Sequence, residues 1–124
     1  MPIKILVIDD SPLVLAMASD ALIAAGFDVF TATNGIEANS FIFSTNNRPD
    51  LIILDIMMPL LDGNKKAKIL KEKDFSKDIP ILFISSKEES ELIQMVAESG
   101  ADGYIRKPFT PQGIVSSVKK VLKM

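Results

Sequence analysis

The sequence contains no cysteine and no histidine among its 124 residues. The absence of cysteine excludes thiol nucleophiles, zinc thiolate sites and disulfide bonds. The absence of histidine removes the usual proton shuttle of enzymes and the commonest ligand of transition metals. The chemical groups that remain are carboxylates, hydroxyls, lysine amines and the backbone, which suit a hard cation bound by oxygen atoms.

Long hydrophobic runs are also missing, because no apolar stretch approaches the length that crosses a bilayer. The amino terminus lacks the charged and then apolar layout of a signal peptide. Charge is nearly balanced, with 14 basic and 16 acidic side chains, so there is no excess of lysine and arginine to neutralise nucleic-acid phosphates. These features predict a cytoplasmic protein that binds neither a membrane nor a nucleic acid.

The composition, with 48% hydrophobic and 24% charged residues, is that of one globular domain. Five short apolar runs recur along the chain, and three of them are almost continuously hydrophobic, as in strands that are covered on both faces. The predicted strands are 3–8, 28–32, 51–54, 81–84 and 103–106. Strands of this kind are typical of parallel sheets.

Helical segments lie between the predicted strands, and their ends carry recognisable signals. Ser11 and Thr110 each precede a proline and are predicted N-caps with proline at the first helical position. Ser86 has a glutamate three residues later, which is the spacing of a capping box, and Gly26 and Gly100 lie where helices should end. Five strand–helix units predict an α/β doubly wound parallel sheet with right-handed connections.

Polar side chains follow the predicted strands at the edge where ligands bind in such sheets. They are Asp9, Asp10, Asp55, Ser85 and Lys107. Each one alone could be a turn or helix-cap residue. Three ionised carboxylates about 5 Å apart, however, repel by about 3 kcal/mol per pair at an effective dielectric near 20. Because the sum rivals the stability of a whole domain, the cluster predicts a bound divalent cation, and so few oxygen ligands favour Mg²⁺ and the handling of a phosphoryl group.

Four motifs that end predicted strands carry a family resemblance. They are VIDDS at 7–11, DLIILDIMMPLLDG at 50–63, ISSK at 84–87 and GADGYIRKPF at 100–109. In this order they resemble the receiver domain of bacterial response regulators, and the resemblance covers essentially the whole chain, 1–124. It implies a flavodoxin-like (βα)5 sheet with the strand order 2-1-3-4-5, which is also found in a chemotaxis receiver.

The resemblance implies a role for each site residue. Asp55 would be the nucleophile that takes a phosphoryl group and forms an acyl phosphate. Asp9, Asp10 and Asp55 would hold Mg²⁺ together with the backbone carbonyl of Met57. Lys107 would neutralise a phosphoryl oxygen.

The resemblance also implies a switch around the phosphoryl group. Ser85 would donate a hydrogen bond to it, and Pro108 would follow a cis peptide bond. On phosphorylation Ser85 would shift, Tyr104 would rotate inward, and a downstream protein would read the surface of the fourth helix, fifth strand and fifth helix. Met57 and Lys87 would flank the attacking water, and because neither side chain positions water well, we expect a long-lived phosphoryl group.

The implied function is that of a phosphoacceptor switch in a two-component phosphorelay, not of an enzyme with turnover. Since the chain has no histidine, we expect the donor to be a histidine kinase, a histidine phosphotransfer protein or a small acyl phosphate. The last predicted helix ends near the terminus, so we expect a stand-alone regulator. It would be a monomer or a weak dimer that forms on phosphorylation.

Three other functions share parts of this pattern. A flavin-binding flavodoxin has the same architecture, but its first loop offers hydroxyls and glycines in place of two carboxylates. A haloacid-dehalogenase-type phosphatase also uses an aspartyl nucleophile with Mg²⁺, but it has Asp-x-Asp after the first strand and needs more chain for a cap. An inactive pseudo-receiver would make protein contacts only, although the site residues are present in this sequence.

Overall fold

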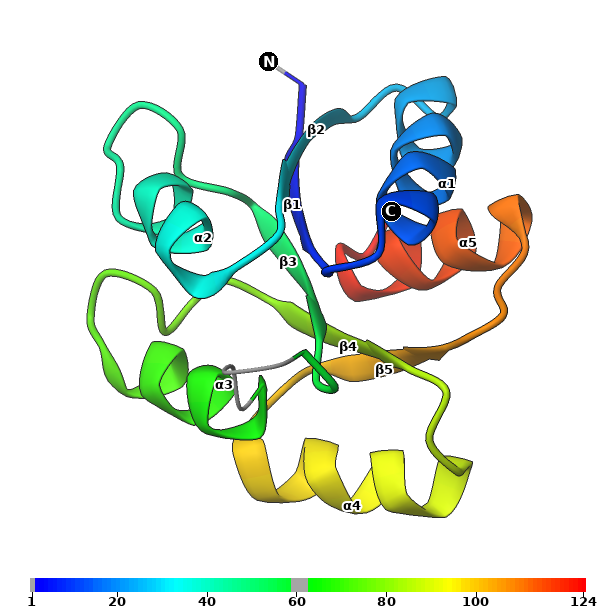
Figure 1. Ribbon diagram of the computed structural model, residues 1–124. Coiled ribbons are helices and arrows are strands. Elements are labelled where there is room, and N and C mark those ends of the chain that lie inside the picture. The colour runs from blue at the N-terminus through cyan, green and yellow to red at the C-terminus, as the bar shows by residue number, and fades with distance from the viewer. Residues whose placement is uncertain (1, 59–62) are drawn as a thin grey trace.

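The computed structural model describes residues 2–58 and 63–124. Within them, parallel strands form a five-stranded sheet in the order β2-β1-β3-β4-β5, so the predicted architecture and strand order are confirmed (Figure 1). The strands are β1 (Lys4–Ile8), β2 (Asp28–Ala32), β3 (Leu51–Asp55), β4 (Ile81–Ser85) and β5 (Gly103–Arg106). The helices are α1 (Pro12–Ala24), α2 (Gly35–Ile42), α3 (Gly63–Glu72), α4 (Glu89–Ser99) and α5 (Pro111–Val121).

Helices cover both faces of the sheet. Figure 1 shows α1 and α5 on one face and α2, α3 and α4 on the other. The buried side chains form two matching clusters, one with Leu22 and Val118 from the first pair of helices, the other with Ala38, Leu70 and Leu92 from the remaining three. Every position of β3 and β4 is buried, which explains their continuous hydrophobicity. In the described parts of the chain, no helix is long and apolar enough to cross a membrane.

The predicted helix caps at Ser11 and Thr110 are confirmed. Ser11 Oγ accepts a hydrogen bond from Val14 N at 3.3 Å, and Thr110 Oγ1 accepts one from Gly113 N at 2.9 Å. Gly100 ends α4 with φ 81°, a left-handed conformation that glycine adopts without strain. These local signals set where the chain leaves each strand and starts the next helix.

The capping box predicted at Ser86 is wrong. α4 begins only at Glu89, and Glu88 before it makes no side-chain cap bond. The amide of Lys87 donates instead to Ser85 Oγ at 3.0 Å, which holds this segment as a turn outside the helix. The serine hydroxyls after β4 therefore belong to the edge of the sheet and not to the helix end.

Candidate functional site at the carboxyl edge of the sheet

Four neighbouring strands end at one edge of the sheet and bring the predicted site residues together. Asp55 and Ser85 are the last residues of β3 and β4, while Asp9 and Asp10 follow β1 and Lys107 follows β5. Asp9, Asp55 and Ser85 are almost completely buried, with 0%, 2% and 0% of their surfaces exposed. Asp10 is exposed. Burying two carboxylates is costly unless charges or hydrogen bonds compensate, so this edge is not arranged for stability alone.

The ends of β1, β3 and β4 hold their polar side chains in the same way. In each case the backbone amide two residues later donates a hydrogen bond to the side chain. These strand-end turns are Ser11 N to Asp9 Oδ1 (2.9 Å), Met57 N to Asp55 Oδ1 (2.8 Å) and Lys87 N to Ser85 Oγ (3.0 Å). Each turn fixes one oxygen through the backbone and leaves the second oxygen of each carboxylate for other partners.

Lys107 lies between the two buried carboxylates. Its Nζ is 2.9 Å from Asp9 Oδ2 and 3.5 Å from Asp55 Oδ2. The amide of Lys107 donates to the carbonyl of Ser85 at 2.8 Å, and the peptide bond between Lys107 and Pro108 is cis. Burial lowers the pKa of the Lys107 amine, but the ion pairs with Asp9 and Asp55 outweigh burial and raise this pKa above its ordinary value. Lys107 is therefore a fixed positive charge at the site.

The pKa of Asp55 is raised above its ordinary value. Burial is the main cause, and the charge of Asp9 adds to it. The amide of Met57 and the ammonium of Lys107 oppose this shift without cancelling it. The ionised form of Asp55 is therefore less stable in the protein than in water. A further positive charge beside it would stabilise this form.

The carboxylates of Asp9, Asp10 and Asp55 fit a hard divalent cation. One oxygen from each lies within 4.8 Å of the others. Asp9 Oδ2 is buried, and its close partner is the Lys107 ammonium, 2.9 Å away. Three carboxylates against one lysine leave negative charge that an oxygen-seeking ion such as Mg²⁺ would balance, and the exposure of Asp10 leaves room for its water ligands. The Met57 carbonyl stays a predicted further ligand.

An apolar hollow beside Lys107 was not predicted from the sequence. Its volume is about 260 Å³. It is lined by Leu13, Val14, Met17, Ser86, Lys107, Pro108 and Phe109. Leu13 is 68% exposed, so α1 is apolar on its outer side as well as toward the core. Apolar residues on both sides of a surface helix are the sequence feature that could have indicated a contact surface here.

Tyr104, the predicted switch residue, lies on the edge strand β5. Its hydroxyl donates a hydrogen bond to the carboxylate of Glu89 at the start of α4, a partner that sequence spacing did not indicate. This bond is the main reason why the pKa of the Tyr104 phenol is raised. The bond ties the edge strand to the first turn of α4.

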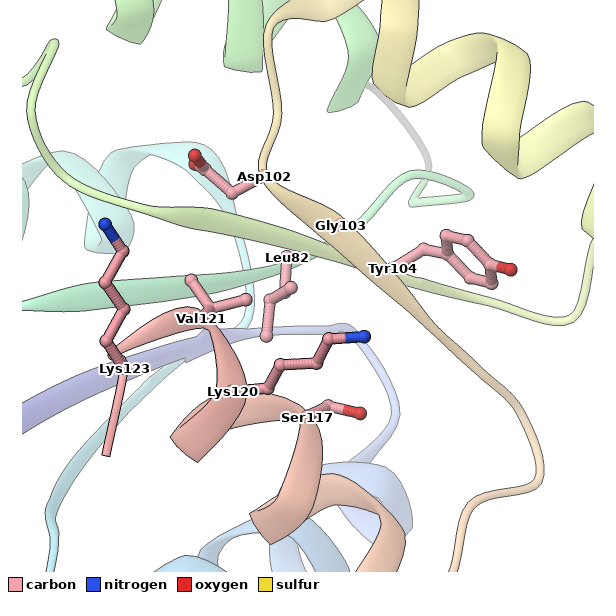
Figure 2. Close-up of a pocket in the computed structure, with 8 residues that line it drawn as sticks. All are labelled: Leu82, Asp102, Gly103, Tyr104, Ser117, Lys120, Val121 and Lys123. Carbon is pink, nitrogen blue, oxygen red and sulfur yellow. The ribbon is translucent and has the colours of Figure 1, made fainter.

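A groove with a volume of about 550 Å³ lies between β5 and the end of α5 (Figure 2). Its lining residues are Leu82, Asp102, Gly103, Tyr104, Ser117, Lys120, Val121 and Lys123. None of the carboxylates of the acidic cluster lines this groove, so it is separate from the site formed by Asp9, Asp10 and Asp55. Pro59, Leu60, Leu61 and Asp62 of the second sequence motif lie outside the described residues.

Comparison with known proteins agrees with this geometry. The family model described as "Response regulator receiver domain" matches residues 5–119. The chain is 38% identical over 120 residues to the alkaline phosphatase synthesis transcriptional regulatory protein PhoP of Bacillus subtilis, which covers 97% of this chain and 48% of PhoP. The chemotaxis response regulator CheY4 of Vibrio cholerae superposes with a TM-score of 0.88 at 32% identity, covering 98% and 99% of the two chains. A two-component response regulator from Clostridium difficile gives 0.86 at 30%, covering 98% and 96%.

The similar proteins differ in length. The chain spans about half the length of the curated relatives that it matches. It spans almost the whole of the two solved structures. All of them match the part of this chain that contains the sheet and its acidic edge. This chain belongs to the response regulator receiver domain family.

Proposed function

We propose that the chain accepts a phosphoryl group on Asp55 from an external phosphohistidine, in a reaction that depends on Mg²⁺, and thereby works as a signalling switch. The observation that supports this proposal most directly is the surrounding of Asp55. This buried carboxylate lies 3.5 Å from the Lys107 ammonium and within a three-carboxylate cluster, and its pKa is raised.

Each side chain has a role in the transfer. Asp55 Oδ1 is held by the Met57 amide, so Oδ2 is the oxygen proposed to attack phosphorus while the bond from phosphorus to the donor nitrogen breaks. Lys107 would bind a phosphoryl oxygen, and Ser85 would donate a hydrogen bond to one. The carboxylates of Asp9, Asp10 and Asp55 would hold Mg²⁺, which supplies positive charge against the phosphoryl oxygens when bound.

The donor must come from another protein or a small molecule, because the chain contains no histidine. A histidine kinase or histidine phosphotransfer protein has to bring its imidazole to Asp55. The apolar hollow beside Lys107, with the exposed Leu13 at its edge, is the surface that we assign to that contact. Because the hollow lies next to Lys107, a partner that docks an apolar side chain there would also bring its phosphohistidine close to Asp55.

The output of the switch is proposed on the surface formed by α4, β5 and α5. Phosphorylation would draw Ser85 toward the phosphoryl group and turn Tyr104 inward, which breaks the bond from Tyr104 to Glu89. Along this surface α4 carries glutamates and no basic residue, whereas α5 carries lysines and no acidic residue. A partner with the complementary order of charges would recognise it. Tyr104 is the only tyrosine, and the chain has no tryptophan, so tyrosine fluorescence reports this movement directly.

Acetyl phosphate tests the central claim. Incubation with acetyl phosphate and Mg²⁺, followed by intact-mass measurement, should add one base-labile phosphoryl group to the wild type and none to Asp55→Asn. Leaving out Mg²⁺ should prevent the addition. Asp28→Asn, which removes an exposed aspartate of β2, is the matched control and should be phosphorylated normally. A folded wild type that takes up no phosphoryl group would be an inactive pseudo-receiver, and the proposal would be rejected.

Met57 and Lys87, called here the rim residues, are proposed to set the lifetime of the phosphoryl group. Met57 is 57% exposed, and the Lys87 ammonium is drawn 3.5 Å from Glu91. Neither side chain presents an oxygen that could orient attacking water, so the acyl phosphate should be long-lived. Met57→Asn should shorten its lifetime, measured as decay of the phosphorylated mass after the donor is removed. Rapid loss in the wild type that Met57→Asn leaves unaltered would contradict this assignment.

Membership of the receiver family does not favour the flavin-binding or phosphatase alternatives. Some similar proteins have about the length of this chain and others are about twice as long. Action as a stand-alone regulator therefore stays a prediction. The absence of nucleic-acid binding, the cytoplasmic location and the monomeric or weakly dimeric state also stay predictions.

A further inference from the structure

Met57 combines closeness to the acidic cluster with access to solvent. Its amide is 2.8 Å from Asp55 Oδ1, and 57% of the residue is exposed. The next residue, Met58, is only 6% exposed. Peroxides oxidise an accessible thioether to a sulfoxide, while a buried thioether is shielded. Two adjacent methionines therefore differ sharply in their access to oxidants, and the accessible one is next to the proposed phosphoacceptor.

We propose that Met57 is a site of oxidation by peroxide and that its sulfoxide shortens the lifetime of the phosphoryl group on Asp55. The inference rests on the proposed function, because it concerns the same carboxylate. In the reaction with hydrogen peroxide, the O–O bond breaks and a sulfur–oxygen bond forms. The sulfur loses two electrons, and the peroxide is reduced to water. The product is reversible, since methionine sulfoxide reductases restore the thioether.

The effect follows from the change in polarity at a fixed position. The strand-end turn at β3 holds the backbone of Met57 against Asp55, so the modified side chain starts from a position next to the proposed acyl phosphate. A thioether sulfur is a weak hydrogen-bond acceptor, whereas a sulfoxide oxygen is a strong one. Such an oxygen can hold the attacking water in position. The expected acceleration is roughly two- to tenfold, the effect of one neutral hydrogen bond on a rate.

The second rim residue does not respond in this way. The Lys87 ammonium is paired with Glu91 at 3.5 Å and is inert to peroxide at neutral pH. Of the two rim residues, Met57 alone changes its chemistry on oxidation. The site would then lose its phosphoryl group faster under peroxide stress while its metal-binding carboxylates and Lys107 remain intact.

The test compares the wild type with Met57→Leu, a substitution of similar volume that cannot be oxidised. Both full chains are treated with hydrogen peroxide, freed of it with catalase, and phosphorylated with acetyl phosphate and Mg²⁺. Peptide mapping locates the added oxygen atoms, and intact mass follows the decay of the phosphorylated form. Exposed methionines elsewhere, such as Met124 at 66% exposure, are oxidised in both chains and control for remote effects.

We expect Met57 to be oxidised before Met58, and peroxide to shorten the phosphoryl lifetime in the wild type roughly two- to tenfold but not in Met57→Leu. Treatment with methionine sulfoxide reductases should restore the original lifetime. An unchanged wild-type lifetime, or the same change in both chains, overturns this inference and leaves the proposed function intact. Failure of untreated wild type to accept a phosphoryl group rejects both.

Discussion

Two lysine–aspartate contacts lie at opposite edges of the same sheet, and they differ in how well their charges are satisfied. Before the starts of β4 and β5, Lys71 Nζ is 2.9 Å from Asp102 Oδ2. The same Asp102 oxygen accepts the amide of Ile81 at 2.8 Å, and Lys71 also donates to the carbonyl of Ile79 at 3.0 Å. One positive charge meets one negative charge there, and both make further hydrogen bonds. This arrangement joins α3 to two strands and is structural.

At the carboxyl edge the balance is different. Lys107 faces two buried carboxylates, and a third carboxylate lies beside them. The residue types are the same at both edges, so residue type does not distinguish a functional site from a structural one. The distinguishing property is the unbalanced charge, which costs stability and which, on the proposed function, a bound cation would balance.

Removing the structural contact should have the largest effect on folding. Asp102→Ala leaves the Ile81 amide and the Lys71 ammonium without this acceptor. We expect the free energy of unfolding to fall by about 2 kcal/mol, measured by urea denaturation, because a polar group left unsatisfied costs about 1–3 kcal/mol and Asp102 is partly exposed. Asp74→Ala is the control, since the pair of Asp74 with Lys77 is solvent-exposed, and its midpoint should not change measurably. Equal losses of unfolding free energy in both variants would show that the contact of Lys71 with Asp102 stabilises the fold no more than an exposed ion pair.

Magnesium should act on the acidic edge alone. At ten times its dissociation constant, Mg²⁺ should stabilise the wild type by about 1.4 kcal/mol, seen as a higher melting temperature. Asp102→Ala should keep this response, because the altered residue lies at the other edge. Asp10→Ala should lose most of it. A wild type whose melting temperature ignores Mg²⁺ would show that the unbalanced charge is not a metal site.

A substitution at Asp55 should change the free energy of unfolding in the opposite direction to Asp102→Ala. Because the pKa of Asp55 is raised in the folded protein, its ionisation destabilises the fold at neutral pH. Asp55→Asn should therefore raise the free energy of unfolding of the metal-free protein at pH 7, measured by urea denaturation. The gain should shrink as pH falls through the folded-state pKa and disappear below the unfolded value of about 3.9. Destabilisation by Asp55→Asn at pH 7 would contradict the raised pKa.

The smallest effect concerns the contact between Tyr104 and Glu89, which lies near the surface. The phenol of Tyr104 should titrate above its ordinary pKa of about 10, followed by ultraviolet absorbance of the phenolate. The stabilisation from this bond is present below the unfolded pKa and is lost as pH rises through the folded one. Glu89→Gln should bring the phenol back toward its ordinary pKa, with little change in melting temperature. An unchanged titration curve would show that the bond does not hold the tyrosine in solution.

The sequence predicted the strands, the helix caps at Ser11 and Thr110, and the polar residues that lie at the carboxyl edge, because these signals are local. The almost continuously apolar runs and the serine and threonine caps before prolines each depend on a few adjacent residues. The strand order followed from the resemblance, and it places β1 beside β3, which makes Asp9 and Asp55 neighbours at the edge where the parallel strands end. The failure at Ser86 is also local in origin, since the Ser85 hydroxyl forms a turn with the Lys87 amide that competes with a capping box.

The contacts that sequence reasoning missed are those between distant elements. Lys71 and Asp102 are 31 residues apart, and Tyr104 and Glu89 belong to different elements, so no spacing rule indicates either pair. The apolar hollow beside Lys107 likewise needs α1 and the segment after β5 to be placed side by side. Such features depend on the packing of the whole fold, and only the structure supplies them.

The strand-end turns have a consequence for how easily such a site can diversify. Residues 11, 57 and 87 hold the reactive groups through their amides, so every amino acid except proline offers the required donor. On the proposed function, substitutions at 57 and 87 should change how long the phosphoryl group persists while its transfer to Asp55 is preserved. A saturation library limited to codons 57 and 87, which leaves the α1 cap at Ser11 intact, should therefore yield mostly folded proteins with widely different decay rates.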